Sequence, residues 1–148
     1  MTMGVKGLLF TVLAVTSYID IKKRTVPELT HVWIIGMTLL TLGQVTMSSR
    51  WLGLVVISVP LMIIALLTKA LGGGDVKLFA TLGFLLGVGD ILSIAFFAFV
   101  IAAGYALFLM IVMKKSKKTA IPFVPFITLG VVLTVFFNIG QYLLWAYY

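Results

Sequence analysis

The sequence contains no cysteine, and it has few charged residues and a single histidine. Without cysteine, the 148 residues cannot form disulfides, thiol nucleophiles or Cys-ligated zinc sites. Because His31 stands alone, a His-rich metal site is also excluded. Charged residues make up 10% of the chain and hydrophobic residues 62%, whereas a soluble domain has about one quarter charged residues. This composition argues against a soluble globular fold.

Long apolar runs account for most of the chain. A helix needs about 20 mainly apolar residues to cross the hydrocarbon core of a bilayer. The fourth run below is short for a crossing and contains Gly83 and Gly87. We therefore predict an all-α polytopic membrane protein with about six transmembrane helices, in which residues 1–148 form a single unit without a separate soluble domain. The runs cover residues 4–21, 30–47, 51–68, 76–89, 91–112 and 121–146.

Along the chain, loops with many basic residues alternate with loops that have few, so most of the basic residues lie on one side of the predicted bundle. The formal net charge is +7, and most of the Lys and Arg residues fall in loops that share one side. Cytoplasmic loops collect Lys and Arg, so we expect this side to be cytoplasmic and both termini to be external, in a multi-pass protein of the cell membrane. The basic residues thus indicate a lipid bilayer as partner and not nucleic acid. On the basic side lie Lys22, Lys23, Arg24, Lys69, Lys77, Lys114, Lys115, Lys117 and Lys118; the other side has Lys6 and Arg50.

Only four acidic residues occur, and two of them fall at the same predicted membrane boundary. Asp20 ends the first run and Asp75 precedes the fourth. Two carboxyl groups in a poorly solvated site do not both ionise easily, so one keeps a proton and acts as acid while the other acts as base. This pair is the arrangement of an aspartic protease. Glu28 and Asp90 are interpreted as acids at the starts of helices, which need no catalytic role.

Two other interpretations of Asp20 and Asp75 remain open at this point. Each aspartate could simply cap a membrane helix. Alternatively, the chain could be a small non-enzymatic transporter or pore subunit in which both carboxylates bind a cation or proton. Two features argue against a transporter: both acids lie at one face of the membrane, and no repeat is evident between the two halves of the sequence. The glycines Gly72, Gly73 and Gly74 favour a site, since they leave backbone room beside Asp75.

Three segments resemble motifs of the type IV prepilin peptidase family. Members of this family are membrane aspartic proteases with a GxGD motif. Residues 20–27 (DIKKRTVP) resemble the family's aspartate, basic stretch and aliphatic-proline ending at Pro27. Residues 72–78 (GGGDVKL) resemble its GxGD segment, formed here by Gly72, Gly74 and Asp75, and the Val-Lys-Leu that follows, which includes Lys77. Residues 121–126 (IPFVPF) resemble the proline-aromatic segment that opens the last span.

The resemblance implies removal of the short, positively charged leader from pilin-like precursors at the cytoplasmic face of the membrane. Asp20 and Asp75 would form the catalytic pair, and the partner would be a precursor whose hydrophobic helix docks beside the protease helices. No metal and no organic cofactor is implied. The resemblance does not specify the oligomeric state. A protease of the presenilin kind would share the chemistry, but the segment from Asp20 to Pro27 favours the prepilin type.

The sequence departs from the family pattern at two points. Glu28 follows Pro27 where the family often has asparagine, so the resemblance assigns no function to this position. The longer bifunctional members carry an N-terminal cytoplasmic region with paired cysteines, and no cysteine occurs in this sequence. The length resembles the short peptidases of tight-adherence pilus systems, and the missing cysteines argue against N-methyltransferase activity.

Overall fold

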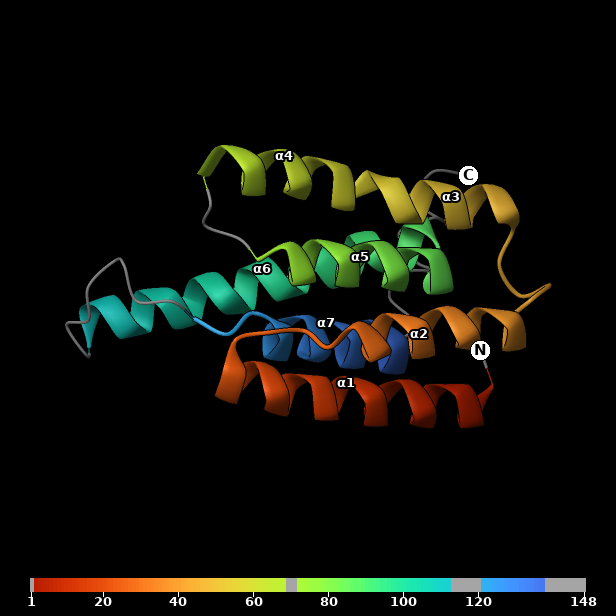
Figure 1. Ribbon diagram of the computed structural model, residues 1–148, viewed down its shortest axis with the longest axis horizontal. Helices are drawn as coiled ribbons and strands as arrows, with labels where there is room; N and C mark the ends of the chain where they lie inside the picture. Colours follow the sequence, from red (N-terminus) through yellow and green to blue (C-terminus); the bar gives the residue numbers. More distant parts are fainter. Residues whose placement is uncertain (1, 69–71, 113–120, 138–148) are drawn as a thin grey trace.

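The computed structural model describes residues 2–68, 72–112 and 121–137, and these residues form helices joined by short connections (Figure 1). No strand occurs among them. The predicted fold class is confirmed: the chain is an all-α polytopic membrane protein. The helices are α1 (Met3–Lys23), α2 (Glu28–Leu40), α3 (Met47–Val56), α4 (Ser58–Thr68), α5 (Gly73–Leu86), α6 (Val88–Ile111) and α7 (Val124–Phe137).

Each predicted apolar run corresponds to one helical rod, because α3 and α4 together form the third run. Only Ile57 separates these two helices. Pro60 has no N–H to bond the carbonyl of Val56, the last residue of α3, so the regular helix is interrupted at this point. The second run was predicted too long, because α2 ends at Leu40 and Gly43 then adopts a φ of 85° in the following turn. The end of the last run and the cluster Lys114–Lys118 lie outside the described residues.

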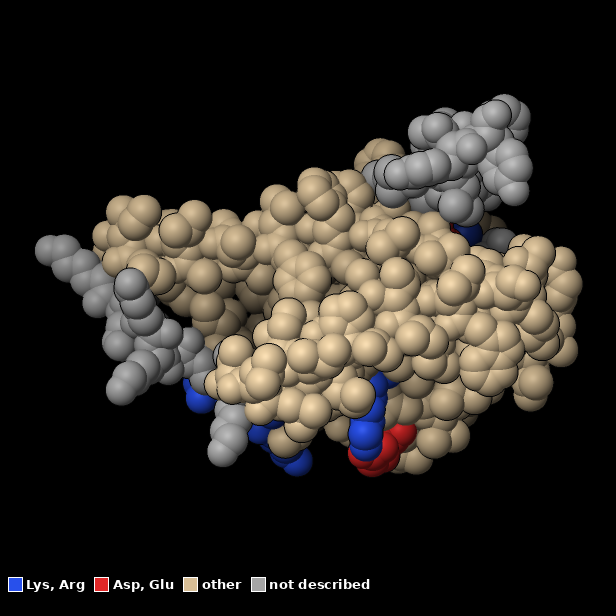
Figure 2. All heavy atoms as spheres, turned by 90° about the horizontal axis from the view of Figure 1, so that it is seen from above, with Lys and Arg blue, Asp and Glu red and all other residues tan. Residues whose placement is uncertain are grey.

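Three helical rods are long and apolar enough to cross a membrane: α1, the α3–α4 rod and α6. Helix α7 is apolar but shorter, and α5 has 14 residues, in agreement with the prediction that the fourth run is short. Large apolar side chains cover the outside of the bundle, with Leu67 80% and Ile111 74% exposed. Figure 2 shows a face that is almost entirely uncharged, with most of its visible Lys, Arg, Asp and Glu side chains along one edge. Such a surface suits contact with lipid.

Helix α5 lies at the centre of the bundle, where it packs against α2, α3, α4 and α6. Its contact with α3 is made at Gly53 and Gly83, where a Cβ atom on either glycine would overlap the backbone of the other helix. Small residues allow this close approach, as is common between membrane helices. On the other side of the bundle, Gly130 of α7 lies against the carbonyl oxygen of Ile94 in α6. The contact between Gly53 and Gly83 fixes the position of α5 and therefore of Asp75.

Hydroxyl pairs join α1 to its neighbours near the end that carries Asp20. The Thr16 and Thr30 hydroxyls lie 2.9 Å apart and connect α1 with α2. The Ser17 and Thr128 hydroxyls lie 2.7 Å apart and connect α1 with α7. Hydrogen bonds of this kind join helices where apolar packing gives no preference over lipid.

Arg50 was interpreted from the sequence as a loop residue that signals topology, and the structure corrects this. Its side chain is fully buried and binds the C-terminal ends of two helices. Nη1 donates to the carbonyls of Phe84 and Leu85 in α5, both at 3.0 Å. Nη2 donates to the carbonyl oxygen of Thr41 at 2.7 Å and to its hydroxyl at 3.1 Å. The guanidinium satisfies carbonyls that have no partner within their own helices.

Candidate active site

Asp20 lies in the last turn of α1, and its side chain is only 5% exposed. The backbone N–H of Val124 donates to its Oδ2 at 3.1 Å. Val124 is the first residue of α7, so the carboxylate faces the N-terminus of that helix, where negative charge is favoured. The start of the last helix therefore holds the Asp20 carboxyl group in place.

Asp75 lies in the first turn of α5, outside the three rods that are long enough to cross a membrane. Burial and, to a smaller extent, the nearby Asp20 carboxylate raise the pKa of its carboxyl group to about 6, and a backbone hydrogen bond from Gly72 opposes this shift. Both main causes disfavour the charged form. A carboxyl group in this environment can hold a proton closer to neutral pH than an exposed aspartate.

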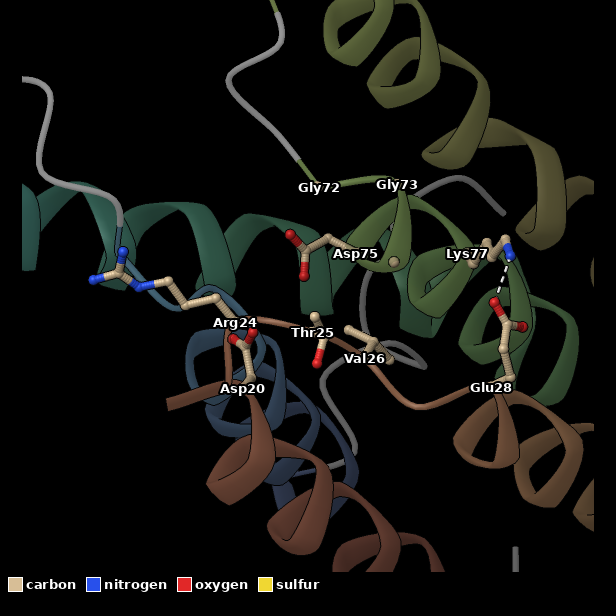
Figure 3. A pocket seen from close by; sticks show the side chains of 10 residues that line it. Asp20, Arg24, Thr25, Val26, Glu28, Gly72, Gly73, Asp75 and Lys77 are labelled. Atoms are coloured by element: carbon tan, nitrogen blue, oxygen red, sulfur yellow. Dashed lines mark hydrogen bonds and ion pairs between the residues drawn. The ribbon is translucent and has the colours of Figure 1, made fainter. Parts of the chain in front are cut away.

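Asp20 and Asp75 line the same pocket, whose volume is about 380 Å³ (Figure 3). The two residues come from different helices, and Figure 3 shows both carboxyl groups at this pocket. No hydrogen bond joins the two side chains, both of which the structure describes. Among the carboxyl groups at the pocket, those of Asp20 and Asp75 influence each other electrostatically and leave space between the α1–α2 connection and α5. Its lining comprises Asp20, Arg24, Thr25, Val26, Glu28, Gly72, Gly73, Gly74, Asp75 and Lys77.

The glycines before Asp75 differ in what surrounds them. A Cβ on Gly74 would lie 3.0 Å from both Cβ and Cγ2 of Val26, so Gly74 provides the room in which the α1–α2 connection packs against α5. A Cβ on Gly72 would lie 3.3 Å from Oδ2 of Asp75, and one on Gly73 would meet nothing within 4 Å. The space that the sequence led us to expect beside Asp75 is therefore occupied at Gly74 by Val26.

An ion pair at the edge of the pocket joins the first turn of α2 to the second turn of α5. Nζ of Lys77 donates to Oε1 of Glu28 at 2.8 Å, and both side chains are exposed (Figure 3). Lys77 holds the pKa of Glu28 below its usual range. Pro27 does not line the pocket; it precedes α2 as its N-cap, with a φ of −63°. The pairing of Glu28 with Lys77 was missed from the sequence, although opposite charges next to two site motifs were a usable signal.

The segment 121–126 contributes to the site in a way that the sequence did not indicate. Besides the N–H of Val124, it supplies Phe123, whose ring lies 6.1 Å from that of Phe79 and 5.6 Å from that of Phe99, between centroids. These contacts fix the start of α7 against α5 and α6. The single histidine, His31, is buried, and neither of its ring nitrogens has a partner among the described residues.

Within the described ranges, no three His, Cys, Asp or Glu side chains come together as metal ligands would.

Comparison with known proteins gives one family match and one curated relative. Residues 7–107 match the model of the type IV leader peptidase family, a range that includes both Asp20 and Asp75. The "Prepilin leader peptidase/N-methyltransferase" of Bacillus subtilis (strain 168) is 39% identical over 74 residues, which are 49% of this chain and 30% of the relative. The chain thus matches about a third of the length of that relative. No solved structure shows a significant match.

Proposed function

Because the chain belongs to the type IV leader peptidase family, we propose that it is a membrane-embedded aspartic endopeptidase that removes the leader peptide of type IV pilin-like precursors. The observation that carries the proposal is the presence of Asp20 and Asp75, far apart in the sequence, in one pocket. Family membership favours this function over a transporter that uses the same two carboxylates.

In the proposed reaction, Asp20 acts as base and Asp75 as acid. A water molecule between them gives a proton to Asp20 while its oxygen bonds to the carbonyl carbon of the scissile peptide bond, and Asp75 gives its proton to the carbonyl oxygen. Asp75 is assigned the proton because burial and the charge of Asp20 raise its pKa to about 6. The C–N bond then breaks, the nitrogen takes the proton from Asp20, and Asp75 recovers its proton from the diol.

The proposed orientation places the pocket at the cytoplasmic face of the cell membrane and both termini outside. It is supported by Arg24 and Lys77 at the pocket itself and by Lys22 and Lys23 in the last turn of α1. A basic leader that remains in the cytoplasm would then reach the two carboxyl groups without crossing the membrane.

The activity is tested by expressing the protein with a tagged pilin-like precursor in cells that lack other leader peptidases. We expect a shorter product whose new N-terminus, read by mass spectrometry, lies directly before the hydrophobic helix. Uncut precursor with several different pilins, at normal levels of the protein in the membrane, would count against the peptidase proposal.

A further inference from the structure

The pocket that holds Asp20 and Asp75 has a third carboxyl group, that of Glu28, which the proposed reaction does not use. The sequence has four acidic residues, and the structure describes all of them. Asp20 is buried, and Asp75 and Asp90 are half-buried. The Glu28 side chain is 77% exposed. Glu28 therefore has the acidic side chain that a charged group of a substrate can contact without displacing Asp20 or Asp75.

The ion pair with Lys77 leaves one oxygen of this carboxylate available. Nζ of Lys77 donates to Oε1 of Glu28 at 2.8 Å, and Oε2 accepts no hydrogen bond from a described residue. A carboxylate has about four sites at which it accepts hydrogen bonds, so Oε2 can bind a second donor while Oε1 stays paired. Lys77 also holds the pKa of Glu28 below its usual range, so the carboxylate is charged near neutral pH.

The charged side chains are separated along the pocket. Figure 3 shows Arg24 on one side of the Asp20 and Asp75 carboxyl groups and Glu28 with Lys77 on the other. The end at Arg24 has a positive charge without an acid beside it, whereas at the other end the charges of Glu28 and Lys77 balance. A cationic side chain is therefore repelled near Arg24 and finds its acceptor at Glu28.

Glu28 and the two aspartates are near enough to contact neighbouring residues of one bound peptide. All three line a single pocket of about 380 Å³. A cavity of this size holds only a few residues of an extended chain, which advances about 3.3 Å per residue. A side chain that binds Glu28 thus belongs to a residue within a few positions of the peptide bond at Asp20 and Asp75.

We propose that Glu28 binds a lysine or arginine side chain of the leader close to the scissile bond, and so selects substrates with a basic residue at that position. The inference rests on the proposed function and adds to it a residue that determines specificity. The asparagine that is frequent in the family at this position has no charge with which to make this selection. A purely structural role of the ion pair between α2 and α5 predicts no dependence of cleavage on the charge of the substrate.

The proposal is tested by cleavage kinetics of purified protein in detergent. Each Lys and Arg in the leader of a tagged precursor is replaced in turn by Gln. With the parent protein, we expect one replacement to lower kcat/KM by about fivefold, mainly through a higher KM, since an exposed pair of charges has an effect of this order. Glu28→Gln should cleave this neutral precursor and the original one equally well.

Two control variants separate substrate selection from the structural role. Lys77→Met breaks the same ion pair but keeps the Glu28 carboxylate, and Asp90→Asn removes the same charge outside the pocket. Both should keep the preference for the basic precursor, whatever their overall rate, and Glu28→Lys should prefer a precursor with Glu at that leader position.

Three results would overturn the inference and leave the peptidase proposal intact. They are equal cleavage of the basic and neutral precursors by the parent, a preference that persists in Glu28→Gln, and a preference that Lys77→Met loses to the same extent as Glu28→Gln. A parent protein that cleaves none of several precursors would overturn both proposals.

Discussion

Of the three glycines before Asp75, Gly74 is the one at which the lack of a side chain matters most for packing at the site. A Cβ on Gly74 would lie 3.0 Å from the Val26 side chain, a contact so tight that Val26 would have to move. The contact brings the connection after Asp20 against the helix that begins at Asp75. At the residue scale, this apolar contact is one of those that set the separation of the two carboxyl groups, beside the hydrogen bond from Val124 to Asp20.

We expect Gly74→Ala to lower precursor cleavage strongly, by tenfold or more as an order of magnitude, because Val26 and the connection beside Asp20 must move away. Gly73→Ala is the matched control, since its Cβ would meet nothing within 4 Å. Cleavage is measured on a gel at equal membrane levels. The double variant Gly74→Ala with Val26→Ala should recover part of the activity, and equal activity of the two alanine variants would contradict the account.

The pH dependence of cleavage follows from the raised pKa of Asp75, which is about 6. A raised pKa means that the neutral acid is present below about pH 6 and is lost as the pH rises through that value. If Asp75 supplies the proton, kcat/KM should decline above about pH 6, with a midpoint that belongs to the pair of carboxyl groups. The measurement is the cleavage rate of purified protein in detergent between pH 5 and 8.5, with circular dichroism to show unchanged helix. A rate independent of pH over this range would contradict the assignment.

At the scale of the elements, Arg50 connects the ends of α2, α3 and α5 through buried hydrogen bonds to three carbonyls. Removing the guanidinium takes a donor from each of these carbonyls, although the carbonyl of Thr41 keeps the backbone N–H of Gln44. We expect Arg50→Met to destabilise the protein by about 3 kcal/mol, as loss of buried charged hydrogen bonds does. Thermal unfolding in detergent measures this change, with exposed Lys23→Met as control. If Arg50→Met unfolds at the temperature of the control, Arg50 is not the structural connection described here.

The elements were largely predictable from the sequence, because apolar runs and their breaks follow from composition. The fold class and the short fourth helix were predicted from this pattern. The pattern could not give the end of α2 at Leu40, because Thr41, Leu42 and Val45 continue the apolar run through a turn that Gly43 permits by its positive φ. Nor could it show that Arg50 is buried, because an arginine beside an apolar run usually lies at the membrane surface.

The motifs of the site were visible in the sequence, but the contacts between them were not. Asp20, Gly72, Gly74, Asp75 and Lys77 line one pocket. The donor to Asp20 is a backbone N–H of Val124, and a backbone group leaves no signature in the sequence.

At the scale of the whole molecule, the bundle places a polar pocket at the end of an apolar surface. Three rods have the length to cross a membrane, whereas α5, with Asp75 in its first turn, has only 14 residues and is enclosed by other helices. A short helix that is enclosed by longer helices can begin below the membrane surface, because the longer helices separate its polar end from the lipid. This arrangement would let a substrate helix remain in the membrane while its leader junction reaches the two aspartates.

The most direct test of the central claim is precursor cleavage by Asp20→Asn and Asp75→Asn, compared with the parent protein and with Asp90→Asn. Asparagine preserves the shape of aspartate and removes its acid-base function, and Asp90, in the first turn of α6, does not line the pocket. We predict that cleavage disappears in the first two variants and persists in the parent and in Asp90→Asn. Cleavage that persists in either Asp20→Asn or Asp75→Asn at equal membrane levels would contradict a two-aspartate mechanism.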